Sequence, residues 1–297
     1  EVSDEYTLKK HSSELFADKA IEFLGKAKNT DKPFFMYVAF NAPHDPRQAP
    51  KKFVDMYPPE KIAIPKNYLP EHPFDNGAIK IRDEALAPFP RTKEVVQVHR
   101  SEYYAIITHM DREIGRILKA LKKSGRADET YVVFTADHGL AVGQHGLMGK
   151  QNSYDHSIKM PFMISGPGIS KGATVDEKIY MQSVYSTTCE LAGLKVPDSV
   201  EYPSIVPLIK GEAKGGEEVI FNAYIETQRL VRTDRYKLVH YPKIRRDQLF
   251  DIKEDPFETK DLIDDPKLEK VRKRLLVTLR NKRTELGDGL LSASGGK

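Results

Sequence analysis

Apolar residues recur at helical spacing in two long stretches of the chain. In residues 8–28 one side of the predicted helix carries Phe16, Ala20, Phe23, Leu24 and Ala27. In residues 97–123 the stripe consists of Ile107, Met110, Ile114, Ile117, Leu118 and Leu121, and Gly125 follows as a stop signal. A stripe of this period predicts a helix with one face against a core. A shorter helix is predicted over residues 182–193.

Three short apolar runs have the length of strands buried in a parallel sheet: residues 34–40, 130–135 and 161–165. The first run ends in loop residues 41–46, and the second ends in residues 136–139. Polar side chains thus follow strand ends, where open α/β sheets bind their ligands. Alternating helices and strands predict an α/β fold.

The pattern changes after about residue 215, where short strand candidates follow one another over residues 217–223, 228–231, 236–241 and 249–252. A charged helix is predicted from residue 266 to 285. We therefore predict three parts: an α/β domain over 1–214, a small antiparallel sheet plus helix over 215–285, and a disordered Gly/Ser-rich tail over 286–297. Residues 48–95 are rich in proline and predict a long excursion over the surface.

Composition narrows the class of protein. Of the 297 residues 39% are hydrophobic and 30% are charged, which is typical of a globular protein rather than a disordered one. The net charge of +4 gives no indication of nucleic-acid binding. No apolar run approaches the roughly 18 residues of a membrane span. Cys189 is the single cysteine, so an intrachain disulfide is excluded.

Asp137 and His138 emerge together from a predicted strand. A carboxylate with an imidazole can bind a divalent metal, and oxygen-rich sites suit Ca²⁺ or Mg²⁺. Alternatively, Asp137 caps the loop and His138 lies on the surface. Lys150 follows a glycine-containing loop and can hold a tetrahedral oxyanion, although it can equally be an ordinary exposed lysine. His44 can donate a proton to a leaving group, or simply bond to Asp45.

These motifs, in this order, resemble those of the formylglycine-dependent sulfatases of the alkaline-phosphatase-like superfamily. The central motifs are HMDREIGRIL (109–118), TYVVFTADHG (130–139), GQHGLMGK (143–150), YDHSIKMP (154–161) and GPG (166–168). Upstream are KPFF (32–35) and NAPHDP (41–46), and near the end are RTDRYKL (232–238), LFD (249–251) and EDPFE (254–258). The resemblance covers nearly the whole chain.

The resemblance implies an alkaline-phosphatase-like α/β/α sandwich, incomplete at its N-terminal side, followed by a small C-terminal α+β domain. It implies that Asp137 and His138 are metal ligands, usually for Ca²⁺, and that Lys150 binds the sulfate. His44 takes the place of the histidine that contacts the sulfate or the leaving group. His156 takes a position on the substrate side. A periplasmic or secreted location is also expected from the family.

The substrate is predicted less directly. Residues 229–237, beginning with Arg229, and the proline-rich excursion are expected on the substrate side. Their basic residues suit a sulfated small molecule or glycan.

The nucleophile expected for this family does not occur in the sequence. It is a formylglycine made from Cys or Ser in a Cys/Ser-x-Pro-x-Arg motif, and no such motif is present. Cys189 is followed by Glu190, Leu191 and Ala192, within a predicted helix. Asp4 and Glu5 do not match the two further metal carboxylates of the family. The chain opens without Met or an apolar leader, so we expect a processed, engineered or truncated start.

Three interpretations remain at this stage. The chain is part of a sulfatase, part of a phosphoesterase or phosphonate hydrolase of the same superfamily, or a non-catalytic remnant that binds anions or a partner chain. An upstream reading frame with the nucleophile motif would favour the first over the third. Relative rates on aryl sulfate and aryl phosphate would separate the first two.

The expected parallel sheet gives a testable consequence. Central strands need partners on both sides, and both faces need cover. We therefore expect these 297 residues alone to be unstable, unless another segment or chain supplies the missing strands. Thermal unfolding followed by circular dichroism tests this: a cooperative, high-temperature transition of the isolated monomer would contradict the expectation.

Overall fold

The computed structural model describes residues 10–288, which fall into two compact units. Of these residues, 10–64 and 92–132 belong to one unit, and 65–91 and 133–288 belong to the other. The first two residues of the predicted 8–28 helix, and residues 289–297 of the predicted tail, lie outside the described residues. The domain boundary at residue 214 stays a prediction.

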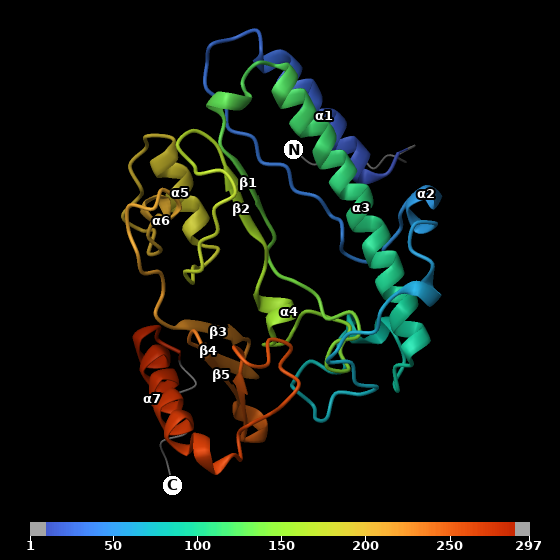
Figure 1. Ribbon diagram of the computed structural model, residues 1–297, viewed down its shortest axis with the longest axis vertical. Helices are drawn as coiled ribbons and strands as arrows, with labels where there is room; N and C mark the ends of the chain where they lie inside the picture. The colour runs from blue at the N-terminus through green and yellow to red at the C-terminus, as the bar shows by residue number, and fades with distance from the viewer. Residues whose placement is uncertain (1–9, 289–297) are drawn as a thin grey trace. The chain divides into compact units, whose positions relative to one another are not determined.

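Two helices lying side by side form the core of the first unit, α1 (Ser12–Ala27) and α3 (Lys93–Lys123) (Figure 1). The side chain of His11 caps α1 by accepting from the amide of Ser13, and Thr92 caps α3 by accepting from Val95. Gly125, with φ 78°, follows the end of α3 as predicted. The buried side chains between the helices are Ala17, Ala20, Leu24, Ile117 and Leu121.

The face of α3 that is buried differs from the predicted apolar stripe. Leu118 is 44% exposed, and Ile107, Met110 and Ile114 are only partly buried. The fully buried row instead runs at spacings of four through Ala105, His109, Glu113, Ile117 and Leu121. Because α1 packs along this row, two polar residues occupy positions that the hydrophobic pattern had assigned to the solvent side.

Residues 34–40 are not the buried strand that their apolar run predicted. Phe34, Met36, Val38 and Phe40 pack against the helix cluster, whereas Phe35 and Tyr37 are 75% and 83% exposed. This alternation is that of extended backbone with one covered face. Within residues 10–288 the run has no strand partner and is therefore not part of a sheet. The rest of the described part of this unit is loop with the short α2 (Lys51–Val54), η1 (Pro59–Lys61) and η3 (Ala127–Glu129).

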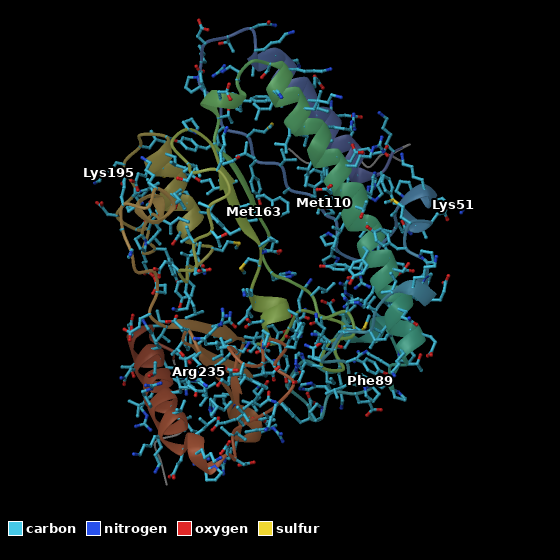
Figure 2. All side chains as sticks on the ribbon, viewed as in Figure 1. Lys51, Phe89, Met110, Met163, Lys195 and Arg235 are labelled. Atoms are coloured by element: carbon cyan, nitrogen blue, oxygen red, sulfur yellow. The ribbon has the colours of Figure 1, made fainter. Side chains whose placement is uncertain are left out.

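In the second unit, β1 (Val132–Thr135) pairs with β2 (Phe162–Ser165), close to the predicted ranges. These strands are covered less than predicted, because Val133 is 37% exposed and Met163 is 58% exposed. Figure 2 labels Met163 on β2. The helices that follow are α4 (Asp155–Ile158), α5 (Ser183–Leu191), as predicted, and α6 (Val206–Ile209).

The C-terminal strands form the predicted antiparallel sheet, in the order β3 (Ile220–Tyr224), β4 (Gln228–Arg232), β5 (Tyr236–Tyr241) and β6 (Arg246–Asp251). The connection at Pro242–Ile244 (η4) and the turn at Pro266–Leu268 (η5) are 3₁₀ helices. The predicted helix is α7 (Glu269–Glu285), and it lies against β4 and β5 (Figure 1).

Both faces of this sheet are buried. Alternate residues of a strand point to opposite faces. On one face Val231, Leu238 and Leu249 pack against α7. On the other, Leu230, Val239 and Phe250 pack against a segment that contains Ala141, Leu147 and Tyr154. The sheet therefore supports the loop that carries most of the candidate functional residues.

The proline-rich excursion is more than a surface loop, which corrects the prediction for its second half. Its second half, residues 65–91, is irregular apart from η2 (Glu84–Leu86), but many of its side chains are buried. Its buried polar residues include Asn67, His72, Asn76, Asp83, Glu84 and Arg91. Buried polar side chains need hydrogen-bond partners, and those of Asn67, His72, Asp83 and Arg91 find them in the 144–151 loop.

No helix within residues 10–288 is both long and apolar enough to cross a membrane.

Lys237 of β5 is fully buried between two carboxylates. Its Nζ donates to Asp155 Oδ1 at 2.9 Å and pairs with Glu258. Glu258 also accepts from the amide of Asp155 at 2.7 Å. Burial favours protonation of Asp155, but Lys237 and Arg232 hold the pKa of this carboxyl below its usual value. The triad joins the sheet to the start of α4.

Replacing Lys237 by Met should lower the free energy of unfolding by about 3–5 kcal/mol, because two carboxylates would be left buried without their cation. Urea unfolding of the intact gene product measures this. The matched control is Lys243→Met, since Lys243 is largely exposed and its pair with Glu226 contributes at most about 1 kcal/mol. A Lys237→Met variant as stable as the control would contradict the assigned role.

Candidate functional site

Asp137 and His138 lie in the loop that follows β1. The Asp137 side chain is 79% exposed, and its Oδ1 accepts from the amide of His138 at 3.0 Å. The imidazole of His138 has its Nδ1 2.8 Å from the carbonyl oxygen of Gly139 and its Nε2 3.3 Å from Asp137 Oδ2. The carboxylate and the imidazole are thus adjacent, on a loop open to solvent.

Backbone hydrogen bonds tie this loop to the segments that follow it. The amide of Gly139 donates to the carbonyl of Ser157 at 2.8 Å, and that of Ala141 donates to Gly149 at 3.0 Å. A Cβ at Gly139 would lie 2.0 Å from the carbonyl oxygen of His156, so only glycine permits this approach. Asp137, His138, Lys150 and His156 are therefore held on one cross-linked segment, residues 137–158, as their order in the sequence suggested.

Lys150 is partly buried and lies beside an acid that the sequence analysis did not identify. Its Nζ is 3.6 Å from Asp83 Oδ2. Burial alone would raise the pKa of Asp83, but hydrogen bonds from Gln151 and Arg82 lower this pKa to about 2. Asp83 therefore stays ionised and positions the ammonium group of Lys150.

Glu84 holds the backbone immediately before Lys150. Its carboxylate accepts from the amides of Met148 and Gly149, each at 2.9 Å, and from Arg91 Nη2 at 2.6 Å. Glu84 is 4% exposed and Arg91 is fully buried. A Cβ at Gly149 would lie 3.0 Å from Glu84 Oε1, so the loop packs tightly on this carboxylate. Sequence reasoning missed Glu84 because no local pattern links it to a loop 64 residues away.

His156 is a residue of α4, and its ring lies against the rings of Tyr154 and His145. Its ring centroid is 5.7 Å from that of Tyr154 and 5.4 Å from that of His145. Its Nδ1 contacts Ser157 Oγ at 2.9 Å, and within residues 10–288 its buried Nε2 has no hydrogen-bond partner. Burial lowers the pKa of His156 well below its ordinary value, and burial likewise lowers the pKa of His145 to about 4. Both imidazoles are therefore neutral near pH 7.

Arg229 does not have the surroundings of a substrate-binding residue. It is 5% exposed, and its guanidinium is used within the C-terminal part of the chain. Nε donates to Asp288 at 2.6 Å, Nη2 donates to the same carboxylate at 3.0 Å, and Nη1 donates to the carbonyls of Ile225 and Gln228. These contacts tie Asp288, just after α7, to β4, so the substrate role predicted for Arg229 gains no support from its geometry.

His44 belongs to the other compact unit. Its side chain is 42% exposed, and its Nδ1 lies 2.8 Å from the carbonyl oxygen of Asp45 and 3.4 Å from Oδ1 of the same residue. This is the local contact that the sequence analysis considered as the alternative to proton donation. The role of His44 in catalysis stays a prediction.

The two residues expected to bind metal fit a divalent site only in part. Asp137 and His138 supply one carboxylate and one imidazole, which is a suitable start for a divalent site. Within residues 10–288, however, no third Asp, Glu, His or Cys has a ligand atom close enough to complete a group of three with them. Two ligands bind a metal weakly, so no catalytic step is derived through a metal from these residues alone.

Glutamine at position 84 should loosen the Lys150 loop. Glu84→Gln keeps the side chain's size but replaces one acceptor oxygen by an NH₂ group that faces a donor at either position, Gly149 N–H on one side or Met148 N–H and Arg91 on the other, at a cost of roughly 1–3 kcal/mol. Hydrogen exchange at the Met148 and Gly149 amides should accelerate, and the melting temperature should fall. Glu71→Gln is the control, because Glu71 is exposed in the same segment. Unchanged exchange at both amides would show that Glu84 does not hold the loop.

Two family models match this chain. The model described as Sulfatase matches residues 2–194, and the one described as N-sulphoglucosamine sulphohydrolase, C-terminal, matches residues 143–285. Together they cover both the candidate site segment and the C-terminal sheet.

Curated relatives agree with this match. The chain is 31% identical over 293 residues to an ulvan-active sulfatase of Formosa agariphila, covering 94% of this chain and 53% of the relative. It is 28% identical over 292 residues to an arylsulfatase of Clostridium perfringens, covering 94% of this chain and 60% of the relative. The chain thus spans between half and two thirds of the length of these two relatives.

Solved structures support the fold. A protein in complex with its substrate D-glucosamine-2-N,6-O-disulfate superposes with a TM-score of 0.79 at 23% identity, covering 95% of this chain and 71% of that one. A phosphonate monoester hydrolase from Silicibacter pomeroyi gives 0.79 at 24% identity, covering 94% and 61%. The mixed α/β architecture is therefore the alkaline-phosphatase-like fold that the motifs predicted. By its match over most of its length to the family model and to relatives that share its fold, this chain belongs to the sulfatase family.

Proposed function

We propose that the gene product is a sulfuric ester hydrolase that cleaves sulfate esters with the help of a metal ion. The observation that carries the proposal is the 137–158 segment, in which Asp137, His138, Lys150 and His156 are cross-linked in the order of the family's motifs. Family membership adds to it, since the curated relatives reported above are named as sulfatases.

Lys150 is proposed to bind a sulfate oxygen. A lysine ammonium stabilises the negative charge that develops on the transferred group. Asp83 beside it orients the ammonium, and Glu84 fixes the preceding backbone. Neutral His156, with its buried Nε2, is proposed to contact the substrate through that nitrogen.

The remaining chemistry is proposed from the family resemblance. His44 protonates the leaving alcohol. Asp137 and His138 would be two ligands of a divalent ion, Ca²⁺ in the first place and Mg²⁺ as the alternative, and such an ion would supply Lewis-acid stabilisation of negative charge. The nucleophile, a formylglycine in this family, and the remaining metal ligands would come from sequence outside these 297 residues.

Further polypeptide is proposed to cover the extended run 34–40. Phe35 and Tyr37 are 75% and 83% exposed. Exposed apolar side chains along extended backbone are typical of a surface that a further strand or chain covers. This agrees with the shorter length of the chain relative to its curated relatives.

The substrate class is proposed to be a sulfated carbohydrate. An ulvan-active enzyme is among the relatives, and a structural neighbour has a disulfated glucosamine as its substrate. A periplasmic or secreted location is proposed as well, because an enzyme there would encounter such polymers.

An aryl-sulfate hydrolysis assay with Ca²⁺ tests the proposal, on these 297 residues and on a version extended with upstream gene sequence. Activity is expected only in the extended version. There, Lys150→Gln should lower kcat/KM by about 100- to 1,000-fold, the loss expected for one charge-stabilising donor. Lys159→Gln is the control, because Lys159 is exposed at the end of the same segment.

Two other results would change the proposal. Hydrolysis of aryl phosphate in preference to aryl sulfate would replace the sulfatase assignment by a phosphoesterase one. Absence of activity on either ester in the extended version would contradict a catalytic role altogether.

A further inference from the structure

His109 is a buried imidazole that the proposed sulfatase chemistry does not use. It is fully buried in the middle of α3, with Phe53 stacked on its ring at 4.9 Å. Within residues 10–288 neither ring nitrogen has a partner in good hydrogen-bonding geometry. A buried polar group without a partner costs roughly 1–3 kcal/mol. A helix that places histidine at such a position needs something to satisfy it.

Two carboxylates face this imidazole. Glu113, one turn further along α3, is also fully buried, and its Oε1 lies 3.9 Å from His109 Nε2. Glu14 of α1 places Oε1 3.3 Å from the same nitrogen. Oε1 of Glu113 likewise has no hydrogen-bond partner in the described part of the chain. The ligand atoms of the three side chains all lie within 4.8 Å of one another.

We propose that Glu14, His109 and Glu113 bind a divalent transition-metal ion, with Zn²⁺ as the best fit, which fastens α1 to α3. Ligands about 2.0–2.2 Å from a tetrahedral ion are about 3.3 Å apart. The pair Glu14 and His109 has this separation already, and Glu113 reaches it by side-chain rotation. Binding would satisfy Nε2 of His109 and Oε1 of Glu113, two of the partnerless atoms.

The donor set decides the class of ion. One imidazole with two carboxylates suits Zn²⁺ and its neighbours, whereas Ca²⁺ takes six to eight oxygens. His11 is close, with its ring 4.5 Å from that of His109, but Nδ1 accepts from Ser13 and Nε2 contacts the carbonyl of Gln48. Water is therefore the fourth ligand. The Glu14 side chain is 28% exposed, which gives the ion a path from solvent.

Two arginines oppose the ion. Arg116 pairs with Oε2 of Glu113, and Arg112 lies 3.5 Å from Oε1, the oxygen assigned to the metal. Arg112 is 46% exposed. A cation at Arg112 repels a metal bound to this oxygen, so its removal should strengthen binding. This consequence separates a metal site from a simple buried cluster of acids and histidine.

The test is titration of the intact gene product with Zn²⁺, followed by calorimetry, and with Co²⁺, followed by its visible absorption. The background is an Asp137→Ala, His138→Ala variant, so that the other candidate metal residues do not contribute. One Zn²⁺ should bind, with Co²⁺ giving the intense visible bands of a tetrahedral site. Glu14→Gln should lower the affinity at least tenfold, and Arg112→Gln should raise it severalfold.

The control is Glu22→Gln, because Glu22 is an exposed acid of the same helix. Glu14→Gln changes a partly exposed residue and should leave the fold intact, which His109→Gln does not guarantee. Zinc affinity unaffected by both Glu14→Gln and Arg112→Gln, or absence of binding, would overturn the proposal. The readout is binding, so its failure is distinct from a failure of the aryl-sulfate assay.

Discussion

A single buried cation organises the second unit. Lys237 is inaccessible to solvent, and a lysine in that position is stable only if carboxylates surround it. Asp155 and Glu258 do so, one from the start of α4 and the other from the loop after β6. Since all three groups must meet, the position of β5 relative to α4 is fixed. The sheet, whose other face is closed by α7, thereby becomes a rigid support for the candidate site.

The same cation affects the histidines of that site. Burial is the main cause of the lowered pKa values of His145 and His156, and the positive charge of Lys237 lowers both further. Tyr154 stacks on His145 with ring centroids 3.8 Å apart and excludes water between them. A neutral imidazole that accepts or donates one hydrogen bond is the result. The buried cation that stabilises the fold therefore also helps to keep the imidazoles of His145 and His156 neutral.

The sequence predicted the regular elements where local periodicity carried the information. The helices around Leu24 and Ile117, and the four C-terminal strands, were all expected. The run 34–40 was wrongly predicted as a buried strand, because hydrophobicity indicates which side chains avoid water but not whether a partner strand is present. The buried face of α3 was predicted only in part: Ile117 and Leu121 are buried as expected, but His109 and Glu113 count as polar in any such pattern and were missed.

The candidate site shows the same division between local and distant information. Asp137, His138, Lys150 and His156 could be identified because loop residues near strand ends form recognisable local motifs. Glu84, Asp83, Lys237 and Glu258 hold the 137–158 segment in place from 64 to 103 positions away. As charged residues they are expected on the surface. Their burial is costly unless each has a counter-charge. A buried charge that already has its partners, like Lys237, supports a neighbouring loop. A buried group whose partners are incomplete, like His109, is the basis on which a ligand is proposed.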